Sequence, residues 1–266
     1  MREGREVVLI TGASSGIGLE LARQFAKYGS DLVLVARREN RLKALAEELN
    51  QSYGTVCVEY CTDLSDIDAS TKVFAFCKKQ NIHIDVLVNN AGFGANDAFV
   101  HLPAELQVRM LNVNIIALTH LTRLFLPDML KKGRGGVLNI ASTGAFQPGP
   151  FIAVYYASKA YVLSFTSALA NEVMGTGLIV SCLAPGPVDT EFRSVAKIPP
   201  DSVLRKVAEK SAFDVARIGY KGFRSGKTLI IPGLMNRIGV FVLRFLGRNW
   251  AANMARSVNK KDNEFA

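Results

Sequence analysis

Tyr155 and Lys159 are the two side chains in this sequence whose types and spacing best suit proton transfer. They lie four residues apart, so on a helix they share one face. An ammonium group held near a phenol favours the phenolate, and it lowers the tyrosine pKa from its usual value of about 10. Tyr155 is therefore a candidate general acid and base near neutral pH. Taken alone, the pair also fits an exposed helical contact, because the chain has seven tyrosines.

A glycine-rich loop near the N-terminus would supply a cofactor for such an acid. The apolar run 7–10 predicts a buried parallel strand, and residues 19–28 have the apolar spacing of a helix. Between them, Thr11 to Gly18 carries the spacing Gly-x-x-x-Gly-x-Gly. In a strand–turn–helix unit, such glycines let the backbone approach a dinucleotide pyrophosphate at the helix N-terminus. The alternative is a purely structural turn.

With these two motifs, the sequence resembles the short-chain dehydrogenase/reductase family, in its subclass of about this length. The resemblance covers about Val7 to Thr190, with 228–232 as a last strand. Ser142 precedes Tyr155 by 13 residues, which is the family's usual gap. The family's motifs occur in order: Asp63-Leu64, Asn89-Asn90-Ala91-Gly92, Asn114, Ser142, Tyr155 with Lys159, and Pro185-Gly186-Pro187-Val188-Asp189-Thr190.

The resemblance implies a catalytic set of Asn114, Ser142, Tyr155 and Lys159. Tyr155 would exchange a proton with the substrate oxygen, and Ser142 would hydrogen-bond that oxygen. Lys159 would lower the pKa of Tyr155 and hold the nicotinamide ribose, while Asn114 would support a water that passes protons to Lys159. Singly, Ser142 also fits a strand-end hydroxyl and Asn114 a helix-interior amide. Tyr156 lies three residues before the lysine, so we expect it to pack.

The resemblance also implies the cofactor contacts. Asp63 would hydrogen-bond the adenine amine, although it also fits the N-cap of a helix starting near Asp66. Asn89, Ala91 and Gly92 would line the adenine ribose, and Val188 and Thr190 would meet the carboxamide and the pyrophosphate. The expected cofactor-binding residues are Gly12, Ser14, Ser15, Gly16, Ile17, Gly18, Arg37, Arg38, Asp63, Leu64, Asn89, Ala91, Gly92, Tyr155, Lys159, Pro185, Gly186, Val188 and Thr190.

The end of the second predicted strand favours NADP(H) over NAD(H). A site that selects NAD places an acid near this point for the ribose 2′-hydroxyl. Here Ala36 stands where the family's acid would be, and Arg37 follows. A guanidinium binds a 2′-phosphate through two hydrogen bonds. Arg38 either shares that contact or begins the next helix.

Apolar residues flank the catalytic motifs and predict an apolar substrate pocket. We expect Phe93, Phe146 and Phe151 to line it, although each also fits ordinary core packing.

The order of apolar and amphipathic segments predicts an α/β fold. Alternating strands and helices imply a doubly wound parallel sheet, a Rossmann fold, with helices on both faces of a single domain. We expect a catalytic domain over 1–232 and an apolar, basic helical extension over 233–266. The expected strands are 7–10, 31–36, 55–61, 86–89, 136–141, 178–184 and 228–231, and the expected helices are 16–28, 38–52, 66–80, 103–130, 154–174 and 202–223.

Composition restricts the compartment and the partners. The 266 residues are 49% hydrophobic, and no run reaches the ~18 apolar residues of a spanning helix. The charged N-terminus has no signal-peptide core, and the four cysteines lack a metal spacing. We therefore expect a reduced, cytoplasmic protein without a metal. No nucleic-acid motif occurs, so we expect no nucleic-acid partner.

The basic excess is confined to the C-terminal part. Residues 1–192 carry a net charge of −1 and residues 193–266 carry +10. Leu234–Trp250 is strongly apolar, and helical spacing puts Arg237, Arg244 and Arg248 on one face. The apolar face would pack on its own domain, form a subunit contact in a homodimer or homotetramer, or lie on a membrane. We expect one of the first two.

Together these patterns predict an NADP(H)-dependent reductase that interconverts a carbonyl and an alcohol on a mostly apolar substrate. One alternative is a reductase of lipid or acyl substrates at a membrane surface. Another is a non-catalytic nucleotide-sensing scaffold on the same fold, against which the intact catalytic set argues.

Overall fold

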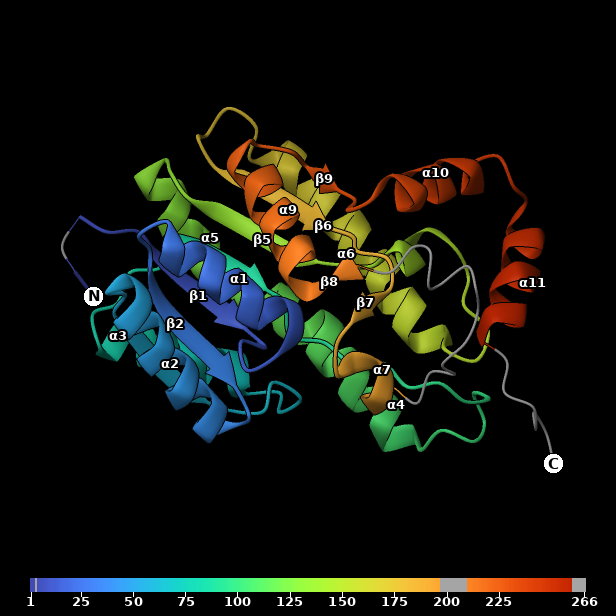
Figure 1. The fold of residues 1–266 in the computed structure, drawn as a ribbon, viewed down its shortest axis with the longest axis horizontal. Helices are drawn as coiled ribbons and strands as arrows, with labels where there is room; N and C mark the ends of the chain where they lie inside the picture. Colours follow the sequence, from blue (N-terminus) through green and yellow to red (C-terminus); the bar gives the residue numbers. More distant parts are fainter. Residues whose placement is uncertain (3, 197–209, 260–266) are drawn as a thin grey trace.

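A parallel sheet forms the centre of the molecule (Figure 1). The structure is a computed structural model that describes residues 1–2, 4–196 and 210–259. Within them, seven strands pair in the order β3-β2-β1-β4-β5-β6-β9, and every pair is parallel. The strands are β1 Val7–Thr11, β2 Asp31–Ala36, β3 Cys57–Cys61, β4 Val86–Asn89, β5 Gly136–Ile140, β6 Ile179–Leu183 and β9 Leu229–Ile230.

Helices cover both faces of this sheet, as the alternation of segments predicted. Three of them, α1, α2 and α9, pack on one face, and α3, α5 and α6 pack on the other. The helices are α1 Gly16–Lys27, α2 Glu39–Tyr53, α3 Ala69–Lys79, α4 Ala104–Leu111, α5 Leu118–Lys132, α6 Ala153–Glu172, α7 Phe192–Val195, α9 Ala212–Arg224, α10 Leu234–Leu243 and α11 Arg248–Asn259. The doubly wound, single-domain α/β prediction is confirmed.

Alternation along each strand divides the core into two layers. Val8 and Ile10 of β1 face α1 and α9, whereas Val7 and Leu9 face α3 and α5. All of the central strands are buried on both sides, which explains their nearly continuous apolar sequences.

The strand order reverses between β1 and β4, since β2 and β3 continue on one side and β5, β6 and β9 on the other. Ligands of open α/β sheets bind at such a switch point, beyond the carboxyl ends of the strands. The glycine loop and the Asn-Asn-Ala-Gly motif follow β1 and β4, so the fold brings them together at this point.

Three details differ from the sequence-based expectations. The expected helix 103–130 is α4 and α5 joined by a π-helical segment, η1 Asn112–Ala117. The short parallel pair β7 Val188–Asp189 and β8 Lys210–Ser211 was not predicted, because two-residue strands leave no periodic signal. Of the expected helix 202–223, residues 202–209 lie outside the described part, Lys210–Ser211 form β8, and α9 covers the remainder.

The apolar stretch Leu234–Trp250 is not one helix. It is divided between α10, which ends at Leu243, and α11, which begins at Arg248. Arg248 therefore begins a second helix, and only Arg237 and Arg244 keep the shared helical spacing. The domain boundary at residue 232 stays a prediction, and no helix among the described residues is long and apolar enough to span a bilayer.

Candidate active site

The glycine loop forms the floor of a cavity of ≈420 Å³ at the switch point. Gly12 adopts φ +66°, and a Cβ there would lie 2.8 Å from Asn90 Nδ2 and 2.9 Å from Ala91 Cα. Only glycine fits such a position without displacing the neighbouring loop. Gly18 has another role, because a Cβ there would clash with Asn90 and with the Gly12 carbonyl. It therefore lets α1 approach the loop closely.

Thr11 and Asn90 fix the loop that follows β1 to the loop that follows β4. Thr11 Oγ1 accepts hydrogen bonds from the backbone N–H groups of Asn90 and Ala91, both at 3.0 Å. Asn90 Nδ2 in turn donates to Thr11 O at 2.9 Å and to Gly12 O at 3.2 Å. The floor of the cavity is therefore held by polar contacts and needs no ligand to shape it.

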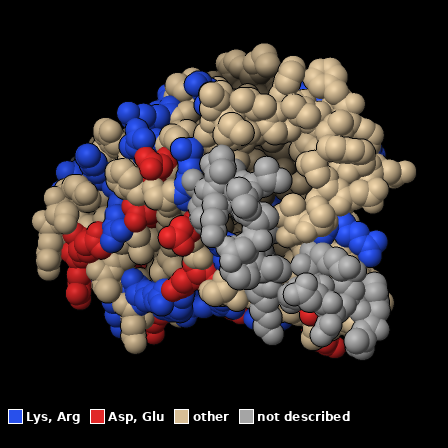
Figure 2. All heavy atoms as spheres, turned by 45° about the vertical axis from the view of Figure 1, so that its right-hand side comes forward, with Lys and Arg blue, Asp and Glu red and all other residues tan. Residues whose placement is uncertain are grey.

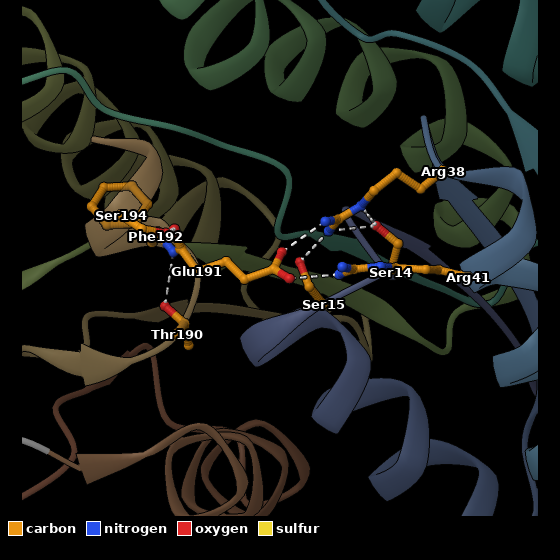
Figure 3. A network of polar contacts seen from close by, with 8 residues as sticks. All are labelled: Ser14, Ser15, Arg38, Arg41, Thr190, Glu191, Phe192 and Ser194. Atoms are coloured by element: carbon orange, nitrogen blue, oxygen red, sulfur yellow. Dashed lines mark hydrogen bonds and ion pairs between the residues drawn. The ribbon is translucent and has the colours of Figure 1, made fainter. Parts of the chain in front are cut away.

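A network of polar contacts joins the loop after β6 to the glycine loop (Figure 3). Arg38 donates to Ser15 Oγ at 2.6 Å and to Ser14 Oγ at 3.2 Å. Glu191 points across to Arg38 and Arg41, with an N–O distance of 2.7 Å to each. Hydrogen bonds from these two guanidinium groups lower the pKa of Glu191 to about 2. The carboxylate therefore stays charged throughout the physiological pH range.

Arg37 lies beside Asp63 at the other end of the cavity. Its guanidinium is 3.7 Å from Asp63 Oδ2, and that of Arg109 is 3.1 Å from the same oxygen. Burial raises the pKa of Asp63, but hydrogen bonds from Ser65 and the positive charges of Arg37 and Arg109 lower it on balance. Asp63 is not the N-cap of α3, because that helix begins at Ala69 after Asp68.

Ser142 and Tyr155 meet on the opposite wall. Their side chains are hydrogen-bonded, and Ser142 Oγ also accepts from Gly144 N at 3.1 Å, which caps the short 3₁₀ helix η2, Thr143–Phe146. The Tyr155 ring is nearly buried and packs 5.1 Å from that of Phe192, centroid to centroid. Tyr156 packs instead against Gly144 and Gly149, as expected from its position before the lysine.

Lys159 lies one helical turn below Tyr155. Its Nζ donates to Ile140 O at 2.8 Å and lies 5.7 Å from the centroid of the Tyr155 ring. Gly92 makes room for it, because a Cβ there would lie 3.2 Å from Nζ. The carboxyl end of β5, the helix α6 and the loop after β4 thus converge on one ammonium group.

Burial determines the pKa of both groups. It lowers the pKa of Lys159 to about 8. It raises the pKa of Tyr155, and the hydrogen bond with Ser142 only partly opposes this. Lys159 is not among the causes of the Tyr155 shift, because its ammonium group is directed at Ile140 O, so the lowering of the Tyr155 pKa by Lys159 stays a prediction. Tyr155 is protonated at neutral pH.

The lowered pKa of Lys159 predicts a pH-dependent stability. Between about pH 8 and the ordinary lysine value of 10.5, the unfolded chain binds more protons than the folded one, so stability rises with pH. Relative to the Lys159→Met variant, the unfolding free energy of the unmodified protein should rise by about 3 kcal/mol over this window. Denaturant titrations of both proteins at each pH measure the difference. If the difference in unfolding free energy between the two proteins stayed constant with pH, the lowered pKa of Lys159 would be wrong.

Asn114 does not line the cavity but fixes two of its walls. Asn114 Nδ2 donates to Phe93 O and to Ser158 Oγ, both at 3.0 Å, and Oδ1 accepts from Phe93 N at 3.1 Å. Ser158 Oγ donates onward to Tyr155 O at 2.7 Å. The π-helical segment thus connects the loop after β4 to the turn of α6 that carries Tyr155. A water relay at Asn114 stays a prediction.

The cavity brings together most of the residues expected from the sequence. Those that line it are Gly12, Ser14, Ser15, Gly16, Ile17, Arg37, Arg38, Asp63, Leu64, Ala91, Gly92, Phe93, Ser142, Tyr155, Lys159, Pro185, Gly186, Val188 and Thr190.

Five expected residues lie elsewhere. Asn89 is buried between β4 and its neighbours, where Nδ2 donates to Thr122 Oγ1 at 3.0 Å and to Asn139 Oδ1 at 2.9 Å. Its side chain therefore connects core elements, whereas the next residue, Asn90, lines the cavity. Phe146 packs in the core, and Phe151 packs beneath Arg256, whose guanidinium lies 5.8 Å from the ring centroid. Gly18 and Asn114 support the walls from outside the cavity.

Sequence reasoning missed Asn90, Glu191 and Arg41. Asn90 belongs to the motif that was quoted, and the alternation of β4 could have indicated that Asn89 points into the core. Glu191 follows Thr190 directly, but no local pattern predicts its contact with Arg38, which is 153 residues away.

Comparison with known proteins identifies the family. The family model for short chain dehydrogenases matches residues 6–198. The chain belongs to the short-chain dehydrogenase family. A short chain dehydrogenase of Pseudocercospora fijiensis is 31% identical over 229 residues, covering 85% of this chain and 72% of that protein. The very-long-chain 3-oxoacyl-CoA reductase of Anas platyrhynchos is 32% identical, covering 95% and 80%.

A solved structure agrees over nearly the whole length. The short-chain dehydrogenase from Sphingobium yanoikuyae, in complex with NADPH, superposes with a TM-score of 0.80 at 30% identity and covers 97% of both chains. The family assignment makes this short-chain dehydrogenase an oxidoreductase that uses a nicotinamide cofactor on alcohol or carbonyl groups. Among its described residues, no group of three His, Cys, Asp or Glu side chains is placed to hold a metal ion.

Proposed function

We propose that the protein is an NADP(H)-dependent reductase of carbonyl groups on mostly apolar substrates. The observation that carries the proposal is the single cavity that holds Ser142, Tyr155 and Lys159 on one wall, the glycine loop on its floor and Arg37 at its far end. An acid, a hydroxyl donor and a dinucleotide cradle at one place suit reduction by a bound cofactor. A scaffold that only senses nucleotide would not need the first two.

The residues at the cavity fit a dinucleotide. Gly12 and Gly16 have positive φ angles, and the N-terminus of α1 opens onto the floor, where backbone N–H groups suit a pyrophosphate. Lys159 lines the cavity, and its ammonium group would hold ribose hydroxyls. Asp63 and Ala91 line the end where the adenine and its ribose would lie. A bound nicotinamide supplies the hydride.

The chain itself supplies the proton and the hydrogen bonds. A tyrosine hydroxyl is protonated at neutral pH, and Tyr155 lines the cavity beside Ser142, so its hydroxyl suits proton donation to a substrate carbonyl oxygen. The Ser142 hydroxyl, which already contacts Tyr155, donates to the same oxygen and stabilises the charge that develops there. The Asn114–Ser158 contacts hold the Tyr155 turn of α6 at a fixed distance from Phe93.

The walls beside Tyr155 support an apolar substrate. Phe93, Ile152, Tyr156, Phe192 and Val195 line that side of the cavity. Burial of apolar surface is the main attraction such a wall offers a ligand. The similarity to a very-long-chain 3-oxoacyl-CoA reductase, over 95% of this chain, agrees with a substrate that carries an apolar chain.

The cofactor preference predicts the effect of a substitution at Arg37. Arg37→Ala removes the guanidinium proposed to bind the 2′-phosphate, so NADPH affinity should fall about tenfold, the lower end expected for an exposed charge-assisted hydrogen bond. NADH affinity should change little. Titration of the protein with each cofactor measures both constants.

Arg109→Ala is the matched control, because Arg109 also pairs with Asp63. It should leave the NADPH preference intact. Equal affinity of the unmodified protein for NADPH and NADH would refute the NADP(H) assignment. The activity itself is tested by following NADPH oxidation with a panel of ketones and aldehydes of increasing chain length. Binding of NADPH without oxidation by any member would favour the scaffold.

A further inference from the structure

Helix α10 presents an apolar face to the outside of the molecule. Its large side chains at the spacing i, i+1, i+4, i+7 and i+8 are exposed, and so is Phe245 just beyond its end. Only Asn236 and Val240 of this helix are buried. The side chains of the α10 face are Leu234, Met235, Ile238, Phe241, Val242 and Phe245.

The exposure of these side chains excludes one of the three contacts expected for the apolar face, which is packing against its own domain. Leu234 is 70% exposed and Phe245 is 76% exposed, so the α10 face does not pack on the domain that carries it. The Phe241 and Phe245 rings contact each other edge to face, with centroids 5.2 Å apart, outside any core cluster. Contiguous exposed apolar surface of this kind marks a contact with a membrane or a protein.

The charged residues of the segment that carries the α10 face are all basic. Arg237, Arg244 and Arg248 are exposed beside it or just after it. The sequence contains no Asp or Glu from Val215 to Lys261. Helices α10 and α11 lie beyond β9 and α6, on the opposite side of the molecule from α2 and α3 (Figure 1). Figure 2 shows a broad area without charged side chains on that side of the molecule.

An apolar face with exclusively basic neighbours matches an anionic lipid surface. Acyl chains accept Phe and Leu side chains, and lipid phosphates attract the arginines. A second copy of the chain fits less well, because a twofold contact would bring the same basic segment against itself. No carboxylate of the segment would then lie between the like charges.

The buried side of α10 borders the cavity, because Asn236 lies against Gly186, which lines the cavity. Helix α11 then leads from α10 to Asn259, which also lines the cavity and whose Nδ2 donates to Pro150 O at 3.2 Å. Asn96 Nδ2 donates to Asn259 O at 3.1 Å, which attaches the end of α11 to the loop after β4. A membrane bound through the α10 face would therefore contact the helix whose opposite side borders the cavity.

We propose that the α10 face binds anionic membrane surfaces peripherally, with its apolar side chains inserted and Arg237, Arg244 and Arg248 at the lipid phosphates. This binding does not depend on the proposed reaction, and it makes a membrane-borne apolar substrate accessible to the cavity.

The test is flotation with vesicles of phosphatidylcholine alone and of phosphatidylcholine with phosphatidylglycerol in equal parts. The unmodified protein should bind only the anionic vesicles, and raising salt from about 0.1 M to about 1 M should weaken binding, because the screening length falls to about 3 Å. Phe245→Asp should reduce the partition coefficient at least tenfold. Met174→Asp is its control, since Met174 is 74% exposed and lies at the end of α6.

A second pair of variants tests the charges without touching the apolar side chains. The combined substitution Arg237→Gln, Arg244→Gln and Arg248→Gln should weaken binding about 100-fold, at about fivefold for each arginine near the surface. The control variant replaces the exposed residues Lys79, Lys131 and Arg134 with glutamine, which changes the net charge equally, and it should have little effect on vesicle binding.

Three results would overturn the proposal. One is the absence of binding to anionic vesicles at low salt. Another is an equal loss of binding in both charge variants, which would indicate only attraction by net charge. The last is a dimer in sedimentation velocity that Phe245→Asp dissociates without any vesicle binding, which would make the α10 face a subunit contact.

Discussion

Replacing Tyr155 with phenylalanine is expected to reduce turnover by about 10²- to 10⁴-fold while NADPH still binds. The substitution keeps the ring that packs against Phe192 and removes only the hydroxyl that contacts Ser142. The variant then lacks the acid that protonates the carbonyl oxygen. The glycine loop and Lys159, which are proposed to bind the cofactor, are unchanged. Steady-state oxidation of NADPH gives kcat, and a separate titration gives the cofactor affinity.

Tyr156→Phe is the matched control, because it makes the same chemical change at the adjacent residue. Its ring packs against Gly144 and Gly149, so turnover should change far less. If Tyr156→Phe abolished turnover and Tyr155→Phe did not, the acid would be Tyr156. If neither substitution abolished turnover, the hypothesis that a tyrosine of α6 donates the proton would be wrong.

Replacing Ser142 with alanine is expected to reduce kcat by about 10²- to 10³-fold, because one donor to the developing oxyanion is lost. The same hydroxyl caps η2 through Gly144 N, so the variant should also lose about 1 kcal/mol of stability. Thermal unfolding measures the stability lost with the cap, and kcat measures the effect of losing the hydrogen-bond donor. Ser142→Thr keeps a hydroxyl and should recover part of both.

Thr143→Val is the control for Ser142. Thr143 also lines the cavity, and its hydroxyl is one residue away from the proposed donor. Its loss should leave kcat nearly unchanged. If the Ser142 and Thr143 variants lost activity equally, the polarity of the wall, and not a particular hydrogen bond, would carry the effect.

The sequence by itself predicted the fold and most of the cavity, because both depend on local patterns. Buried parallel strands are nearly continuous apolar runs, and the helices between them keep their 3.6-residue period, so alternation alone implies a doubly wound sheet. The motifs follow strand ends, and parallel strands bring all their carboxyl ends to one edge. The meeting of Ser142 with Tyr155 and Lys159 was implied by the family resemblance, because the latter two lie on α6 and not at a strand end.

Local sequence patterns did not predict the position of a side chain whose contacts are made with residues distant in sequence. Asn89 and Asn90 are adjacent amides, and only the pleat of β4 decides that the first contacts Thr122 in the core and the second holds Thr11 at the cavity. The pKa of Tyr155 likewise depends on burial and on where the Lys159 ammonium group is directed. The spacing of residues in the sequence predicts neither the burial of Tyr155 nor the direction of the Lys159 ammonium group.

The C-terminal segment shows the same limit at the scale of a helix. Hydropathy identified an apolar and basic stretch, but amphipathic spacing is equally compatible with a core, a subunit or a membrane. Only the tertiary structure decided that the chain turns after α10 and leaves Phe241 and Phe245 exposed. The contact between Glu191 and Arg38 has the same origin, because charges 153 residues apart meet only once the sheet has brought the ends of β2 and β6 to one edge.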